Sequence, residues 1–455
     1  MSAMNDFDRT VAAWLQADGP ADINGIVFEQ AITSAGAVRQ RRGLRLALFG
    51  PAPWPAYGKR IGFATLPAAV RIAILVALSV AALAGAAYVG IGARLFSDVT
   101  SFHGYRGVLV GAPDLLVPRW HPIAVTLADG RVLIVGGNTN GSGVEPTTAE
   151  VFDPATGDQR LTGDLVEAAR LHVDSVALLA DGRVLLVGQR GGPDPGAGHY
   201  SAVVQLFDPA TSTFVPGPPM LTPRIWGQLA RLPDGRVLMA GGMLATGPVV
   251  TTASAELFDP VAGTFTATGS LLTDRFAQSL ALLADGRVLV AGGDSVLADG
   301  EGKVAMSIEV YDPARGSFQS AGMMDTVQFP FLIPRADGRA LIFSQSMSRT
   351  AGMWHGGVVE TVPWRAEPFV PATATPMVDG RIFFTGQWPN STRAWTYDPV
   401  GGTFADVSGL IGHNVYAAVR LLDGRILAIG GYANDDFDNQ HSHIGPAIST
   451  MQIFE

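Results

Sequence analysis

Arginine residues recur at matching positions along the middle of this chain. Each lies about ten residues before an Asp-Gly pair, and a glutamate or glutamine follows some 31 to 35 residues later. The arginines are Arg119, Arg170, Arg224 and Arg275, and the later residues are Glu150, Gln205, Glu256 and Glu309. An arc of guanidinium groups could bind carboxylate or sulfate groups through bidentate hydrogen bonds. The alternative is structural, with each arginine pairing inside its own repeat and bracing it.

A second group of polar side chains lies near the C-terminal end, between residues 434 and 443. Its carboxylates and imidazoles are Asp435, Asp436, Asp438, His441 and His443. Oxygen ligands suit Ca²⁺ and imidazoles suit Zn²⁺, so this segment is a candidate cation site. The spacing matches no defined metal loop, and a solvated polar loop is the alternative. No cofactor is expected.

Aromatic residues form the third candidate group. Two of them stand beside the arginines, and the others fall in predicted loops: Trp120 and Trp226, then Trp354, Trp388, Tyr432 and Phe437. Tryptophan presents a large, flat apolar face that sugar rings can stack upon. The four tryptophans are therefore candidate ligand-binding residues, and packing between repeats is the alternative.

Composition excludes several classes of function. The net charge of −9 argues against a nucleic-acid partner, because such proteins present a basic face. The chain has no cysteine, which excludes disulfides, thiolate metal sites and a cysteine nucleophile. It also contains no Gly-x-Ser-x-Gly or His-Glu-x-x-His motif. No enzymatic activity is predicted, although an unrecognised hydrolase or lyase remains an alternative.

The elements that position these residues are internal repeats. Asp-Gly-Arg occurs seven times, beginning at Asp129, Asp181, Asp234, Asp285, Asp337, Asp379 and Asp423. An alternating apolar run precedes each triplet, and an apolar run ending in one or two glycines usually comes after it. A third run ends in an aromatic residue before Asp-Pro, and a fourth begins at phenylalanine. Asp-Gly between such runs predicts a hairpin with a type I′ turn, so each repeat is a four-stranded antiparallel meander.

Seven such sheets can bury both faces by packing radially as the blades of a β-propeller. The repeat length, the double glycine and the aromatic residue ending the third strand resemble the kelch family. The bacterial kelch modules similar to the propeller of galactose oxidase are the closer resemblance. It covers residues 104–455 and implies an all-β, seven-bladed kelch-type propeller. That oxidase needs a cysteine crosslinked to a tyrosine ligand, so the absence of cysteine excludes its copper-radical chemistry here.

Ring closure and the loop face follow from the same pattern. The chain ends at the equivalent of a third strand, so a strand at about 105–112 is expected to complete the last blade. The Asp-Gly and Asp-Pro turns occupy one face of the predicted propeller. Loops of varied length and sequence collect on the opposite face, where a ligand site is expected.

An uncharged segment precedes the propeller. Residues 72–92 are long enough to cross a bilayer as a helix, and basic residues are more frequent before them than after. A transmembrane helix is therefore predicted at 70–93, with residues 1–60 cytoplasmic and the propeller outside a bacterial cell. Residues 1–60 have the pattern of two short amphipathic helices and resemble the N-terminal segment of membrane-anchored anti-sigma-like proteins. The zinc cluster common in those proteins is absent.

These observations predict a membrane-anchored, extracytoplasmic propeller that acts as a protein- or glycan-binding module. Its partner would bind at the loop face. The alternative from another class is a sensor that signals to a cytoplasmic protein through residues 1–60.

Overall fold

The structure, a computed structural model, describes residues 105–139, 146–166, 171–191, 200–245, 250–296, 302–324, 330–344, 351–362, 370–388, 391–409, 413–433 and 447–455. The chain divides into two compact units, Met1–Ala87 and Tyr88–Glu455. The predicted cytoplasmic segment and membrane span lie outside the described residues. Those that are described form no helix long and apolar enough to cross a membrane.

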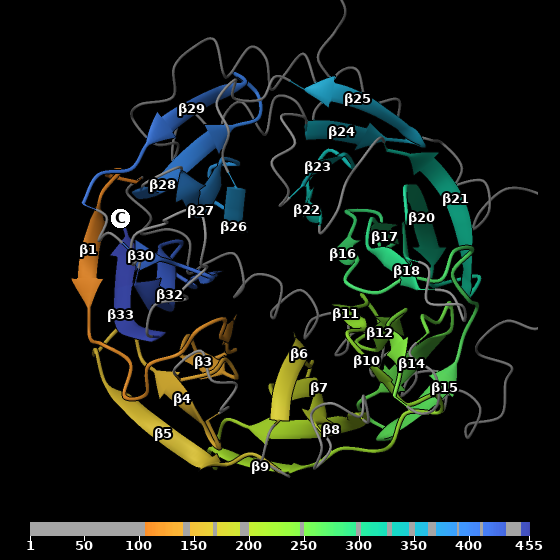
Figure 1. Cartoon of the computed structure of the whole chain (residues 1–455), viewed down its shortest axis with the longest axis horizontal. Coiled ribbons are helices and arrows are strands. Elements are labelled where there is room, and N and C mark those ends of the chain that lie inside the picture. The colour runs from red at the N-terminus through yellow and green to blue at the C-terminus, as the bar shows by residue number, and fades with distance from the viewer. Residues whose placement is uncertain are drawn as a thin grey trace, which may run out of the picture. The chain divides into compact units, whose positions relative to one another are not determined.

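The described part is an all-β propeller of seven blades arranged around a common axis (Figure 1). Each of the first six blades is an antiparallel meander of four strands paired in sequence order, as the repeats predict. Blade 1 holds β2 (Ile123–Thr126), β3 (Val132–Val135), β4 (Thr148–Phe152) and β5 (Gln159–Asp164). Blade 2 holds β6 (Leu171–Leu178), β7 (Val184–Gly191), β8 (Tyr200–Asp208) and β9 (Thr213–Pro216). Blade 3 holds β11 (Gln228–Arg231), β12 (Val237–Ala240), β14 (Ala255–Asp259) and β15 (Thr264–Ala267).

The later blades have the same order. Blade 4 holds β16 (Ser279–Leu282), β17 (Val288–Ala291), β20 (Ser307–Asp312) and β21 (Ser317–Met323). Blade 5 holds β22 (Pro330–Pro334), β23 (Ala340–Ser344), β24 (Ala351–His355) and β25 (Val358–Val362). Blade 6 holds β26 (Val370–Pro376), β27 (Ile382–Trp388), β28 (Ser391–Asp398) and β29 (Thr403–Asp406). Two short ribbons pair β10 (Arg224–Ile225) with β13 (Met243–Leu244) and β18 (Asp294–Val296) with β19 (Gly302–Val304).

The core lies between neighbouring blades. The second strand of a blade, such as β3 (VLIV) or β12 (VLMA), is buried along its whole length. Apolar side chains of adjacent blades therefore share one cluster, as Val135 of blade 1 does with Val184 and Phe207 of blade 2. A strand covered on both faces has a continuous apolar sequence, and this is why an unbroken apolar run stands directly after each Asp-Gly-Arg triplet.

The Asp-Gly turns differ in detail from the predicted type I′ geometry. Gly130 has a φ of 91°, and its amide donates to the Leu127 carbonyl at 3.1 Å. Asp129 is not among the residues with positive φ. The loop therefore has three residues, Ala128 to Gly130, with a type I turn followed by a glycine in the left-handed region. The predicted type I′ turn, which needs positive φ at both central residues, was wrong, because the aspartate takes the third position of the turn.

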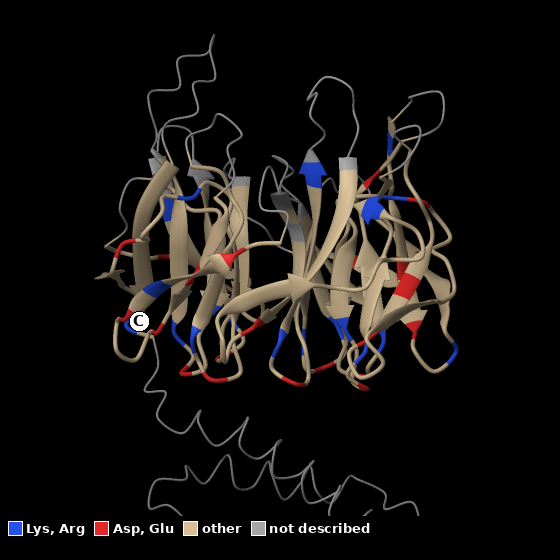
Figure 2. Ribbon diagram, turned by 90° about the horizontal axis from the view of Figure 1, so that it is seen from below, with Lys and Arg blue, Asp and Glu red and all other residues tan. Residues whose placement is uncertain are grey.

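In every blade, the aspartate and arginine of Asp-Gly-Arg stabilise the turn between the first two strands. The Asp129 carboxylate accepts a hydrogen bond from the Arg131 amide at 3.1 Å and pairs with its guanidinium at 2.6 Å. Blade 5 repeats this arrangement, and the hydrogen bond from Arg339 holds the pKa of Asp337 down at about 2. Figure 2 shows the ribbon positions of acidic and basic residues next to one another along the face that carries these turns. The aspartate and arginine of these turns therefore neutralise each other on this face.

The seventh blade contains both ends of the propeller. Its sheet joins β1 (Leu109–Ala112), β30 (His413–Asn414), β31 (Ala417–Arg420), β32 (Ile426–Ala433) and β33 (Ala447–Phe454). β1 pairs antiparallel with β33, from Leu109 opposite Phe454 to Ala112 opposite Met451. The Tyr105 ring stacks on Phe454, with 5.2 Å between ring centroids. The strand lies where the sequence predicts the closing strand.

Candidate functional site

The three described arginines of the predicted arc are completely buried, each paired with the glutamate of its own blade. In blade 1, Arg119 Nε donates to Glu150 Oε1 at 3.1 Å. The equivalent contacts are Arg224 Nη2 to Glu256 Oε1 at 2.5 Å and Arg275 Nη2 to Glu309 Oε1 at 2.6 Å. Buried charges are tolerated in proteins when they are paired and hydrogen-bonded in this way.

Each Arg–Glu pair also fixes the backbone around it. Glu150 accepts from the amides of Leu116 and Val117 at 2.7 and 3.1 Å. Arg119 Nη1 donates to the carbonyl of Gly136, the first glycine of the pair after β3, at 2.9 Å. The same contact links Arg275 to Gly292 at 3.1 Å. We call this unit, consisting of arginine, glutamate and glycine carbonyl, the bracket.

The bracket decides between the two interpretations of the arginines. Burial lowers the pKa of the Arg224 and Arg275 guanidinium groups, while the adjacent glutamates oppose that effect. The geometry of the three described arginines is that of the structural alternative, with each guanidinium buried inside its own blade. Arg170 lies outside the described residues. Gln205, in the glutamate position of blade 2, still accepts a hydrogen bond from the Val166 amide at 2.7 Å.

The residue two positions after each described bracket arginine takes an unusual backbone conformation. His121 and Trp226 each stand two residues after a bracket arginine, with φ angles of 54° and 55°. Ala277 repeats this at 54° in blade 4, so the conformation belongs to the blade rather than to one site. The second glycine of the pair fits against this bend, because a Cβ on Gly137 would lie 2.5 Å from the Trp120 carbonyl oxygen. Glycine is therefore required there.

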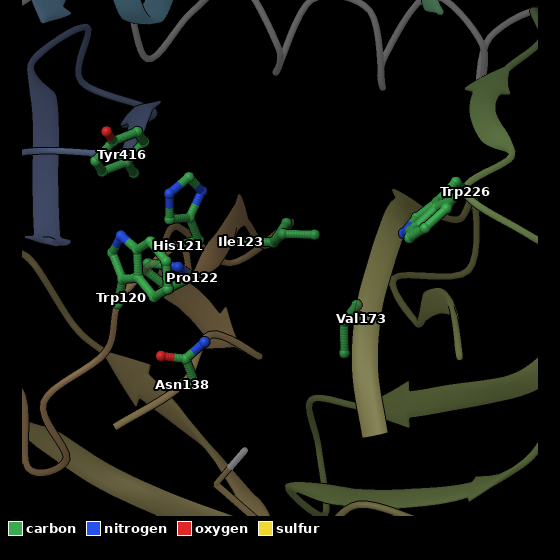
Figure 3. A pocket seen from close by; sticks show the side chains of 8 residues that line it. All are labelled: Trp120, His121, Pro122, Ile123, Asn138, Val173, Trp226 and Tyr416. Carbon is green, nitrogen blue, oxygen red and sulfur yellow. The ribbon is translucent and has the colours of Figure 1, made fainter. Parts of the chain in front are cut away.

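The bend directs aromatic side chains into a cavity near the propeller axis. This axial cavity has a volume of about 420 Å³ and is lined by Trp120, His121, Pro122, Ile123, Asn138, Val173, Trp226 and Tyr416. Figure 3 shows Trp226 on one side, Trp120 and His121 on the other, and Ile123 and Val173 between them. The residues come from blades 1, 2, 3 and 7. Because β2 begins at Ile123 and runs toward its Asp-Gly turn, the cavity opens on the loop face.

The wall formed by blades 7 and 1 is an aromatic stack. The His121 ring lies on the Tyr416 ring, with centroids 3.9 Å apart, and Tyr416 stacks on Tyr432 at 5.7 Å. The edge of Trp120 contacts Tyr432 at 6.0 Å. Across the cavity, Trp226 stacks on Phe276 of the next blade at 5.6 Å. Both walls are therefore held in place by ring contacts between blades.

The axial cavity is lined by apolar and neutral polar side chains together with the imidazole of His121. None of the lining residues is a carboxylate, lysine or arginine. Burial raises the pKa of Tyr416, so its phenol is neutral under ordinary conditions. In the described part of the chain, Trp120 Nε1 and Asn138 Oδ1 have no hydrogen-bond partner. Buried polar atoms are seldom left unsatisfied in proteins, and these two are themselves inaccessible to solvent.

Other sequence candidates lie elsewhere. Trp354 is a strand residue of β24, not a loop residue, and is buried with its Nε1 donating to the Ala321 carbonyl at 2.7 Å. In this position the Trp354 side chain packs between strands and is not among the residues that line the axial cavity. Trp388 ends β27, and its side chain is outside the described residues. Asp435, Asp436, Asp438, His441 and His443 lie outside them as well.

Of the residues that line the cavity, the sequence singles out Trp120 and Trp226 but not His121, Asn138 and Tyr416. His121 could have been found from its place two residues after a bracket arginine, which it shares with Trp226. Asn138 and Tyr416 carry no such signal. They reach the cavity because the Trp120–Asn138 backbone pairing and the contact between the first and last blades place them there.

Comparison with known proteins supports the fold. Neither a scan against family models nor a search of curated proteins finds a match. Among solved structures, the chain is similar to one described as a novel fungal alcohol oxidase of the AA5 family in complex with copper. The identity is 17%, the TM-score is 0.53, and the match covers 76% of this chain and 75% of that one. This chain is therefore a seven-bladed β-propeller structurally similar to the galactose oxidase-like AA5 fold.

Proposed function

We propose that this protein is a kelch-type binding module whose ligand occupies the axial cavity. The ligand would be uncharged and ring-shaped, which favours a glycan residue over a charged peptide. The observation that supports this most directly is the lining: three aromatic side chains and an imidazole face one opening, and no carboxylate or guanidinium is among them. Aromatic faces stack on apolar ring surfaces, and Asn138 adds polar contacts.

Size and rigidity support the same proposal. A volume of about 420 Å³ lies within the usual range for small-ligand sites. The Trp226–Phe276 and His121–Tyr416 stacks hold the walls before a ligand arrives. A preformed site loses less conformational entropy on binding than one that must be ordered.

An enzyme remains an alternative proposal. The similar structure is described as an oxidase in complex with copper. In the described residues, no group of three or more His, Asp or Glu side chains could hold a metal ion, and the chain has no cysteine. Copper is therefore not part of the function proposed here.

Membrane display is the second part of the proposal. We infer that residues 72–92 anchor the propeller outside a bacterial cell, and the distribution of basic residues around this apolar segment supports that orientation. Protease added to intact spheroplasts should then digest the propeller and spare residues 1–70. Protection of the propeller would contradict the orientation. A sensor acting through residues 1–60 is the alternative role, and a sigma-factor gene next to this one would favour it.

The binding proposal is tested by screening the full-length protein on a glycan array beside its Trp226→Ala variant. We expect the wild type to bind a restricted set of glycans and the variant to lose that set. Replacement of the exposed Leu272, which lies in the same part of the chain but outside the cavity, is the control and should leave binding intact. Binding that survives in the Trp226→Ala variant would place the site elsewhere.

A further inference from the structure

The last blade has an altered bracket. His413 lies ten residues before its turn aspartate, Asp423, just as Arg119 lies ten residues before Asp129. Gln452 is paired with Ala428, five residues after Asp423, as Glu150 is paired with Ile134, five residues after Asp129. Histidine and glutamine therefore replace the arginine and glutamate of blades 1, 3 and 4 in the blade that closes the ring.

The replacement leaves buried polar atoms unsatisfied. His413 is 3% exposed and Gln452 is 2% exposed. Within the described residues, neither amide atom of Gln452 nor Nδ1 of His413 has a hydrogen-bond partner. In blade 1, by contrast, Glu150 accepts bonds from two amides, from Arg119 and from the amide group of Gln159. Among the described residues, the closing blade therefore has fewer side-chain hydrogen bonds at this position than blade 1.

Nothing charged in the described surroundings would stabilise an imidazolium at this position. β30, which carries His413, pairs with β32 and packs against β27, and β33 contains Gln452. The only titratable side chains that these strands add are Tyr432 and, just after β30, Tyr416. From blade 1, Arg119 packs its backbone against Gly430 and Gly431, but its guanidinium is paired with Glu150. No carboxylate faces His413 from these elements.

We propose that His413 makes the closing blade acid-sensitive, so that protonation of its imidazole loosens the blade in which the ends of the propeller meet. The imidazolium would be a buried charge in a blade whose glutamate position holds a neutral amide, a cost that blades 1, 3 and 4 avoid by pairing arginine with glutamate. The loosened blade includes the β1–β33 pairing and, through Tyr416, one wall of the axial cavity.

The pH range follows from the direction of the shift. Burial lowers the pKa of His413 below its ordinary value of 6.5. The unfolded blade therefore binds a proton more readily than the folded one. The folded blade has its full stability above about pH 6.5. That stability declines as the pH falls from there toward the pKa that His413 has in the folded protein. One titrating histidine changes the opening equilibrium by at most about tenfold per pH unit in that range.

Hydrogen exchange of the full-length protein at about pH 7.5 and about pH 5.5 tests this inference, after correction for the intrinsic pH dependence of exchange. We expect peptides from residues 447–455 to lose protection on acidification, by up to about tenfold. Peptides from residues 307–323 in blade 4, which contain the bracket residue Glu309, should keep their protection on acidification. Equal changes in both sets would overturn the proposal.

Variants assign the effect to His413. His413→Gln removes the titrating group and should abolish the acid-induced loss of protection. The double variant H413R/Q452E rebuilds the bracket of the other blades and should do the same, which keeps the test decisive if the glutamine variant does not fold. His355→Gln, at an exposed histidine of blade 5, is the control and should behave as the wild type. Persistence of the acid effect in a folded variant without His413 would contradict the proposal.

Discussion

At the scale of residues, one repeated pattern of arginine and glutamate is compatible with two different roles, anion binding and bracing of a blade. Arginines at a repeated position could bind anions or brace a blade, and their spacing is the same in both cases. Burial separates the roles: Arg224 and Arg275 are inaccessible and bonded to carbonyls and a carboxylate of their own blade. Burial depends on the packing of residues about 30 positions apart, which the local sequence does not reveal.

Arg224→Ala is expected to destabilise the propeller strongly. It would leave Glu256 buried without its cation, and breaking a buried pair from one side costs about 3–5 kcal/mol. Arg236→Ala is the matched control, because that arginine makes a partly exposed ion pair with Asp234 in the turn of the same blade. Exposed pairs contribute about 0–1 kcal/mol. Thermal or urea unfolding of the two variants measures the difference, and equal losses would contradict the bracket.

At the scale of elements, the strands and turns were largely predictable. Alternating and continuous apolar runs give the strand order of each blade, and the glycine after each turn aspartate has positive φ as expected. The turn type was not predictable from Asp-Gly alone, because the same dipeptide fits a two-residue and a three-residue loop. In blade 1 the preceding residue, Ala128, takes the second position of the turn and Asp129 the third, because the Gly130 amide bonds back to the Leu127 carbonyl.

The second glycine of the pair gives a prediction at this scale. Gly242 has a φ of 104°, and a Cβ there would lie 2.6 Å from the Ile225 carbonyl oxygen. Gly242→Ala should therefore cost more than the roughly 1–2 kcal/mol of left-handed backbone strain alone. Gly263→Ala is the control, because it also has positive φ (66°) but no atom within 4 Å of the added Cβ. Similar unfolding free energies for the two variants would show that the close approach is not needed.

At the scale of the whole molecule, seven repeats become one ring through the pairing of β1 with β33. The closing strand could be predicted because the last repeat lacks a fourth strand. The axial cavity could not, since its walls come from four blades and its position depends on how the ring brings Tyr416 onto His121. Local patterns predict blades well, whereas a site on the axis depends on their assembly.

Two neighbouring residues test the closure. Leu109 is buried at 6% exposure, and Val110 beside it on β1 is 38% exposed. Leu109→Ala should cost about 2–5 kcal/mol, as truncation of a buried leucine does. Val110→Ala should change stability by less than about 0.5 kcal/mol. If both changes prove equally mild in thermal unfolding, β1 does not seal the last blade in solution.

The central claim, that the axial cavity binds an uncharged ring-shaped ligand, is tested most directly by calorimetric titration of a glycan selected on the array, at low and high salt. The account predicts that Trp226→Ala weakens binding by about fivefold or more, since a ring stacked on an aromatic side chain contributes about 1–3 kcal/mol where this has been measured for nucleic-acid bases. It also predicts that added salt leaves the wild-type affinity unchanged, because no lining residue is a carboxylate or guanidinium. Affinity that falls steeply with salt, or that is indifferent to the loss of Trp226, would contradict it.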